Sequence, residues 1–247
     1  FINKRYVDLT VTKNFASGES GYEYGDYRIP FSLYTKSENT EGTEDVYSLV
    51  SQKTASKNSS NTTDAVFNDL SQGTTYYLKE DIPDNADYVL LSVYRQTSGD
   101  NEDNRVKIEA DENGYYPIQI TDDTDITVTV TNRPLYAKVT IRKVDGSNGD
   151  GLPGAEFVVK DAAGKTVVTE NEWSEGVNQD EGLYTAFIPL TSADGEDFTI
   201  EETVAPEPNY VLSEDVLTIE DLKPGEAITA DSWNEDWEKN PEKSKEA

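Results

Sequence analysis

The chain has 247 residues, enough for two domains of ordinary size, and its 49 acidic and 21 basic residues give a formal net charge of −28. That charge argues against nucleic acid or an anionic membrane surface as a partner, because phosphate binding needs a basic surface. The chain has no cysteine and no histidine, which excludes disulfides, thiol nucleophiles, Cys/His zinc sites and Ser-His-Asp triads.

Short runs of alternating apolar and polar residues predict strands along almost the whole chain, with Gly, Pro, Asn and Asp clusters between them. In chain order the runs are YVDLTVTK, IPFSLYT, YVLLSVYR, DITVTVTN, KVTIRKVD, EFVVKD and FTIEE. EDVYSLVSQ suggests one short helix, and the polar segment Lys36–Asp64 predicts an exposed loop or insertion. Many short strands at this spacing are typical of β-sandwiches.

Three sequence signals recur in the same order in the two halves of the chain. GTTYYLKE and GEDFTIEE both place an aromatic residue, an aliphatic residue and a glutamate after a glycine. LTVTKNF matches VTIRKVD, and ITVTVTN and ITADSWN both end in asparagine. We therefore predict two related tandem domains, 1–134 and 135–238, followed by a polar tail or linker at 239–247.

Each half also places three polar residues on strand faces that are otherwise apolar, because side chains two residues apart in a strand share a face. In the first half these residues follow Leu9 and Val11, Tyr76 and Leu78, and Val128 and Val130. The six residues are Lys13, Glu80 and Asn132 in the first half, and Lys143, Glu202 and Asn234 in the second.

Two structural explanations compete with a chemical one. A position at the end of a strand explains each polar residue taken alone. There a lysine side chain can extend to water, and a Glu or Asn side chain can form hydrogen bonds with the loop backbone. A buried Lys–Glu ion pair leaves the asparagine unexplained. Burial favours a neutral, nucleophilic lysine and a protonated glutamic acid, which can polarise the Asn carboxamide and pass on the proton that leaves with ammonia. The product is a Lys–Asn amide, formed once by the protein on itself without a cofactor or metal.

These segments resemble the collagen-adhesin B-type (Cna B-type) domains of Gram-positive surface proteins and pilins. The resemblance rests on KVTIRKVDGSNGDGLPGAEFVVKDAAGK, FTIEETVAPEPNY and TVTNRP. FTIEETVAPEPNY departs from the family's box by an extra proline and by Asn209 in place of glycine, and YYLKEDIPDNADY lacks the Ala-Pro pair. The resemblance implies an all-β fold, with a transthyretin-like or inverse-immunoglobulin β-sandwich in each domain.

The resemblance also implies an isopeptide bond between the first and last strands of each domain. By position, Lys13 is joined to Asn132 with Glu80 as the catalytic acid, and Lys143 is joined to Asn234 with Glu202 as the acid. Two alternatives stay open in the second domain. Asp231 is a rival acceptor of opposite strand parity to Asn234, and Glu201 is a rival acid on the outward face.

We therefore expect a stalk or shaft module of an adhesin or pilin, not an enzyme acting on external substrates. Its expected location is the bacterial cell surface or cell wall. The expected partners are neighbouring domains or pilin subunits. The abrupt start at Phe1 and the polar end indicate a fragment of a longer protein. The alternative is an adhesive module whose first domain contacts a host extracellular molecule through the 36–64 segment.

Overall fold

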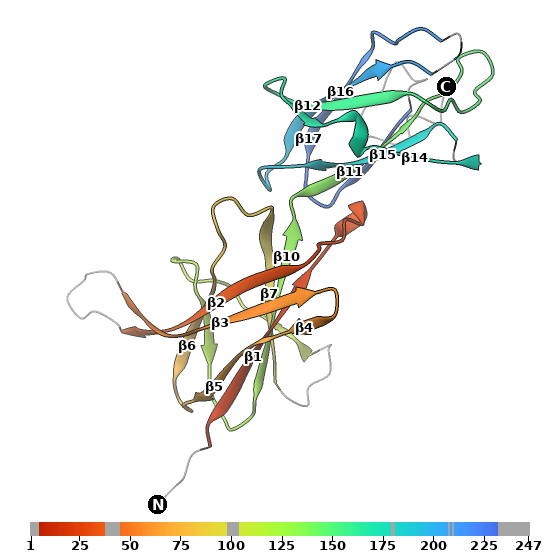
Figure 1. Cartoon of the computed structure of the whole chain (residues 1–247). Coiled ribbons are helices and arrows are strands. Elements are labelled where there is room, and N and C mark those ends of the chain that lie inside the picture. The colour runs from red at the N-terminus through yellow and green to blue at the C-terminus, as the bar shows by residue number, and fades with distance from the viewer. Residues whose placement is uncertain are drawn as a thin grey trace, which may run out of the picture. The chain divides into compact units, whose positions relative to one another are not determined.

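A computed structural model describes residues 5–37, 45–97, 104–178, 181–206, 208 and 210–231 (Figure 1). More than half of the described residues lie in β-strands, and the helical elements include the short 3-10 turns η1 (Gly18–Ser20) and η3 (Glu170–Glu172). The predicted all-β class is confirmed. No helix in the part of the chain that the structure describes is long and apolar enough to span a membrane.

The chain divides into two compact units. Unit 1 comprises Phe1–Phe15, Tyr24–Ala86 and Leu90–Asn132. Unit 2 comprises Ala16–Glu23, Asp87–Val89 and Arg133–Ala247. Two short segments from the N-terminal half of the sequence thus belong to the second compact unit. The predicted tail at 239–247 lies outside the described residues.

Unit 1 is built from two five-stranded sheets, β5-β1-β10-β7-β8 and β4-β3-β2-β6-β9. The first strand, β1, pairs in parallel with β10, the last strand of this unit, and the two lie side by side (Figure 1). The strands are β1 (Val7–Phe15), β2 (Tyr27–Ser37), β3 (Val46–Asn58), β4 (Asn61–Thr63), β5 (Ala65–Leu70), β6 (Thr75–Glu80), β7 (Tyr88–Thr97), β8 (Val106–Lys107), β9 (Tyr116–Gln119) and β10 (Ile126–Pro134).

The alternation predicted from the sequence places the core of unit 1 between these sheets. Buried residues alternate with partly exposed ones along β1, β6 and β10. In β6, Tyr76, Leu78 and Glu80 are buried, while Tyr77 and Lys79 between them are half-buried. The period of two that defined the apolar faces is therefore the period of burial.

The prediction of a loop over Lys36–Asp64 is wrong. Apart from residues 38–44, which lie outside the described residues, most of this segment forms β3 and β4. β3 pairs with β2 from Tyr27↔Lys57 to Ser37↔Val46. The strand hides little apolar surface, since Ala55 is the one buried residue within it. Pairing with β2 through backbone hydrogen bonds stabilises β3, and such bonds do not depend on the side chains. The polar side chains of β3 therefore lack the apolar alternation that predicts a strand. The short helix suggested by EDVYSLVSQ is part of the same strand.

Unit 2 is built from two four-stranded sheets, β14-β15-β11-β18 and β13-β12-β16-β17. Its first and last strands, β11 and β18, again pair in parallel. Side chains including Phe157, Tyr184 and Phe198 fill the core. The strands are β11 (Tyr136–Arg142), β12 (Glu156–Asp161), β13 (Thr166–Val168), β14 (Ser174–Glu175), β15 (Leu183–Pro189), β16 (Glu196–Val204), β17 (Val216–Leu222) and β18 (Ala227–Asp231).

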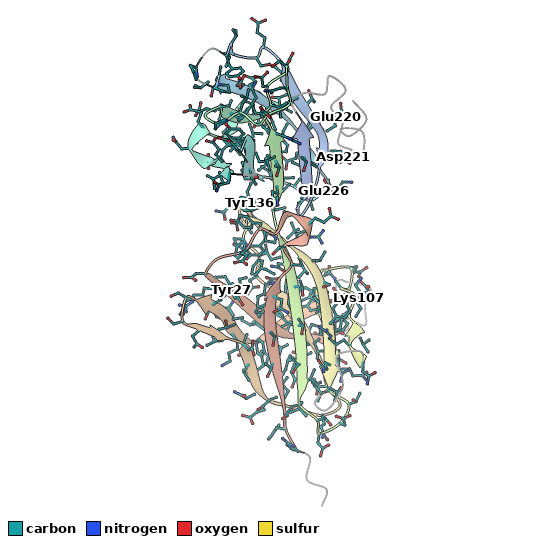
Figure 2. All side chains as sticks on the ribbon, turned by 90° about the vertical axis from the view of Figure 1, so that its right-hand side faces the viewer. Tyr27, Lys107, Tyr136, Glu220, Asp221 and Glu226 are labelled. Carbon is teal, nitrogen blue, oxygen red and sulfur yellow. The ribbon has the colours of Figure 1, made fainter. Side chains whose placement is uncertain are left out.

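The segment Ala16–Glu23 packs within unit 2 through a close backbone approach. A Cβ atom on Gly18, whose φ is +65°, would lie 2.6 Å from the carbonyl oxygen of Gly225. The Ser20 N–H donates to that same oxygen at 2.8 Å. Tyr22 stacks on Tyr136, which is labelled in Figure 2, with ring centroids 4.0 Å apart. Glycine is needed at position 18 because any side chain would clash there.

Candidate functional site

In unit 1 the structure brings Lys13, Glu80 and Asn132 together. Lys13 lies on β1 and pairs with Val130 of β10, so Asn132 lies two residues further along the neighbouring strand and on the same face. Glu80 ends β6 and reaches the pair from the opposite sheet. Lys13 is 3% exposed, Glu80 7% and Asn132 0%, so the three polar groups lie in the interior.

One carboxylate oxygen contacts both of the other groups. The Asn132 side-chain amide donates a hydrogen bond to Glu80 Oε1 at 2.7 Å. Lys13 Nζ lies 3.7 Å from the same oxygen. The amine also donates to the carbonyl oxygens of Asn14, at 3.0 Å, and Val130, at 3.3 Å. Glu80 is thus placed to exchange protons with either partner.

Two buried oxygen atoms of this site are unsatisfied. Glu80 Oε2 and Asn132 Oδ1 have no hydrogen-bond partner among the described residues. Unsatisfied buried acceptors cost free energy, so their presence calls for an explanation. A half-turn of the Asn132 carboxamide would exchange its nitrogen and oxygen, and a protonated Glu80 could then donate to Oδ1. The arrangement suits an acid that activates an amide.

Burial shifts both titratable groups towards their neutral forms. It lowers the pKa of Lys13 to about 8, although the charge of Glu80 and its hydrogen bond act in the opposite direction. It also raises the pKa of Glu80, against the opposing effects of Lys13 and Asn132. Removal of water penalises each charged form, and a neutral amine and a neutral acid are the reactive forms for amide exchange.

In unit 2 the structure brings Lys143 and Glu202 together. Lys143 directly follows β11, and Glu202 lies on β16 in the opposite sheet. Lys143 Nζ is 2.8 Å from Glu202 Oε1, and the two side chains are 13% and 3% exposed. The Ser213 N–H donates to Glu202 Oε2 at 2.8 Å. The predicted third member, Asn234, lies outside the described residues.

The two rivals in unit 2 occupy different positions from the candidates. Glu201 forms an ion pair with Lys160 at 2.5 Å, and these side chains are 35% and 29% exposed. Asp231 pairs in register with Arg142, whose side chain is exposed. Glu201 therefore contacts a lysine on the outward face, whereas Glu202 contacts Lys143.

Sequence reasoning missed the groups that surround the candidate residues. Phe15 places its ring centroid 4.7 Å from Lys13 Nζ, and the Tyr27 hydroxyl donates to the Lys13 carbonyl oxygen at 3.0 Å. Phe15 follows Lys13 by two residues on one strand and so shares its face, but this pattern does not distinguish a ring that covers an amine from one that fills space. No sequence signal points to Ser213, because its backbone N–H makes the contact.

Among the described residues, no group of three or more Asp or Glu side chains could hold a metal ion.

Comparison with known proteins gives one family match. Residues 137–235 match the SpaA prealbumin-like fold domain. No curated protein matches the chain.

Several solved structures are similar at low sequence identity. The TIE protein of Bacillus anthracis is 21% identical, with a TM-score of 0.36, and the match covers 92% of this chain but 34% of that one. The shaft pilin SpaA of Lactobacillus rhamnosus GG is 13% identical, with a TM-score of 0.39 and coverage of 92% and 97%. The major pilin of Streptococcus pyogenes is 14% identical, with a TM-score of 0.37 and coverage of 93% and 98%. For residues 137–235, the family match confirms the transthyretin-like, that is prealbumin-like, fold that the resemblance predicts.

Proposed function

We propose that this chain is a structural stalk or shaft module of a Gram-positive cell-surface adhesin or pilin, stabilised by Lys–Asn isopeptide bonds that it forms by itself. One observation carries the proposal. In the interior of unit 1, Glu80 Oε1 lies 2.7 Å from the Asn132 amide nitrogen and 3.7 Å from Lys13 Nζ. A structural ion pair needs no amide at that oxygen, whereas amide exchange needs all three groups.

The reaction in unit 1 needs no external reagent. Neutral Lys13 Nζ attacks Cγ of Asn132 while protonated Glu80 donates to the amide oxygen. The Nζ–Cγ bond forms and the Cγ–Nδ2 bond breaks. One proton from Nζ passes through Glu80 to Nδ2, which leaves as ammonia, and Glu80 returns to its starting state. The fold holds the reactants together and so replaces a bimolecular encounter.

The strand register supports Asn234 as the acceptor in unit 2. In unit 1 the acceptor lies two residues beyond Val130, the partner of Lys13. In unit 2 Arg142 pairs with Asp231, and Lys143 is the next residue. Continued by one residue, this register would put position 232 opposite Lys143. Two residues beyond it is position 234, not 231. We therefore assign Glu202 as the acid and Asn234 as the acceptor, in domains bounded at 1–134 and 135–238.

The proposed bonds would join strands that begin and end each domain. By analogy with a disulfide, closing a loop of ~100 residues stabilises by about 4–5 kcal/mol through the unfolded chain. Tension applied to the ends of a domain would pass through the bond between adjacent strands and bypass the sandwich. A chain without cysteine gains a link that reduction does not break. These properties suit an extracellular stalk that contacts neighbouring domains or pilin subunits.

Intact-protein mass spectrometry tests the proposal. We expect a mass lower than the sequence value by two ammonia molecules, one for each domain. Glu80→Ala and Glu202→Ala should each restore one ammonia, whereas Glu201→Ala should restore none. Asn234→Ala should restore one and Asp231→Ala none. A well-folded protein with the full sequence mass would rule out the cross-links and leave only the fold.

An adhesive role for the first domain is the second candidate, and exposed apolar side chains on β3 favour it. Val46 is 50% exposed, Leu49 59% and Val50 47%. Exposed apolar groups that lie close together often mark a binding surface. Replacing Leu49 and Val50 by serine should abolish adhesion to immobilised host matrix proteins while the two mass losses persist. Unchanged adhesion would reject this role.

A further inference from the structure

One aromatic ring of unit 1 lies beside the amine of Lys13, and two further aromatic side chains pack against that ring. The ring of Phe15, on the same strand, lies 4.7 Å from Nζ. Tyr24 stacks on Phe15, with centroids 4.0 Å apart and ring planes 7° apart. Tyr27, at the start of β2 and labelled in Figure 2, packs against Phe15 at 5.4 Å. Its hydroxyl fixes the Lys13 backbone by donating to the carbonyl oxygen at 3.0 Å.

Phe15 is also the residue on β1 that lies opposite Asn132. In the parallel pairing of β1 with β10, Phe15 and Asn132 are direct partners. Phe15 is therefore the residue opposite the proposed acceptor, Asn132. Its ring face also lies near the amine of Lys13. Phe15 itself is half-buried, but the Lys13 side chain beneath it is 0% exposed.

The second unit has no aromatic residue at the corresponding place. Two residues after Lys143 the sequence has Asp145, whose carboxylate accepts a hydrogen bond from the Tyr210 hydroxyl at 2.7 Å. The Lys143 side chain is 13% exposed, in contrast to the fully covered Lys13. An aromatic ring excludes water from its surroundings, whereas a carboxylate is strongly hydrated.

We propose that Phe15, supported by Tyr24 and Tyr27, is a positioning residue for cross-linking in unit 1, where it keeps water from Lys13 Nζ and holds the amine beside Asn132. This inference rests on the proposed isopeptide chemistry. The ring takes no part in bond making. It acts through Lys13 by limiting the solvation that would otherwise favour the Lys13–Glu80 ion pair over the neutral pair.

The test follows the rate of each cross-link separately. The full chain is made by cell-free synthesis and sampled over time, and peptide mapping distinguishes the Lys13–Asn132 link from the Lys143–Asn234 link. Phe15→Leu keeps apolar volume and removes the ring. We expect it to slow the first link by about tenfold, the factor that corresponds to one pKa unit on Lys13. The second link in the same sample should be unchanged.

The dependence on pH separates positioning from a general loss of packing. Water at the amine raises the pKa of Lys13 towards its ordinary value, so Phe15→Leu should move the alkaline limit of the first reaction to higher pH. Phe15→Tyr, which restores a ring, should recover the original rate and profile. An unchanged rate and pH profile in Phe15→Leu would overturn the inference.

Two further variants keep the result interpretable. Thermal unfolding of Glu80→Ala with and without Phe15→Leu measures the packing cost where no first link forms. If the double variant is unfolded at the working temperature, Tyr24→Leu serves instead, because it removes the stacking partner and leaves the Phe15 ring. A normal rate in Tyr24→Leu would then overturn the inference. If the unaltered chain forms neither link, the isopeptide proposal itself fails, whatever the variants do.

Discussion

The two units hold the same Lys–Glu combination in different surroundings. In unit 1 the Lys13 and Glu80 side chains are 0% and 3% exposed, their charged atoms are 3.7 Å apart, and Glu80 is shared with Asn132. In unit 2 the Lys143 and Glu202 side chains are 13% and 3% exposed and form a direct pair at 2.8 Å. The comparison teaches that a common strand arrangement can leave the lysine fully covered in one unit and partly exposed in the other.

The largest expected effect is the loss of the first cross-link in Glu80→Gln. Glutamine keeps the size of the side chain but cannot relay a proton, and loss of acid–base catalysis costs typically 10²–10⁴-fold in rate. We expect intact-mass analysis to show one ammonia retained. Unit 1 should then lose about 4–5 kcal/mol of stability in denaturant titration. Full cross-linking in Glu80→Gln would mean that Glu80 is not the acid.

The matching variant in unit 2 tests whether its glutamate has the same role. Glu202→Gln should prevent the second link and leave the first intact. The neighbouring Glu201→Gln is a matched control, because Glu201 contacts Lys160 and not Lys143. Peptide mapping that finds the second link lost in Glu201→Gln but retained in Glu202→Gln would reverse the assignment.

The rate of the first link should depend on pH as a bell-shaped curve. In the proposed reaction the site carries one proton, shared between Lys13 and Glu80; burial lowers the pKa of Lys13 to about 8 and raises the pKa of Glu80. Below the raised pKa of Glu80 both groups bind protons, and the amine is not nucleophilic. Above about pH 8 both groups lose their protons, and no acid remains. The rate measured in cell-free time courses should therefore fall at pH values below and above this range. A rate that still rises above pH 9 would contradict this prediction.

The smallest effect is expected from Tyr27→Phe. This change removes the hydroxyl that donates to the Lys13 carbonyl oxygen at 3.0 Å and leaves the ring. A single hydrogen bond contributes about 0.5–1.5 kcal/mol, so thermal unfolding should show a modest loss in unit 1. Tyr6→Phe is the control, because Tyr6 is 61% exposed. Equal effects of the two changes would contradict a stabilising role for the Tyr27 hydroxyl.

Sequence periodicity predicted the all-β class and the burial of Lys13, Glu80 and Asn132, because burial in a sandwich follows the alternation of the strand. It could not predict β3, which backbone pairing holds while its polar side chains face outwards. It also gave Phe15 no special place, since an apolar residue on the core face has the same pattern whether it fills space or covers an amine. The packing of Ala16–Glu23 within unit 2 includes a backbone contact at Gly18, and a glycine in the sequence does not reveal which backbone it approaches.

The parallel pairing of β1 with β10 also has a consequence for folding. Lys13 pairs with Val130, which lies 117 residues later in the chain. One edge of β1 therefore stays unpaired during folding until the last strand of the domain is in place. Contacts of such long sequence separation form slowly, and a strand edge that is still unpaired can pair with another chain. A Lys13–Asn132 link can form only after the last strand has arrived. The bond would therefore act as a covalent record that the domain had finished folding in the right register.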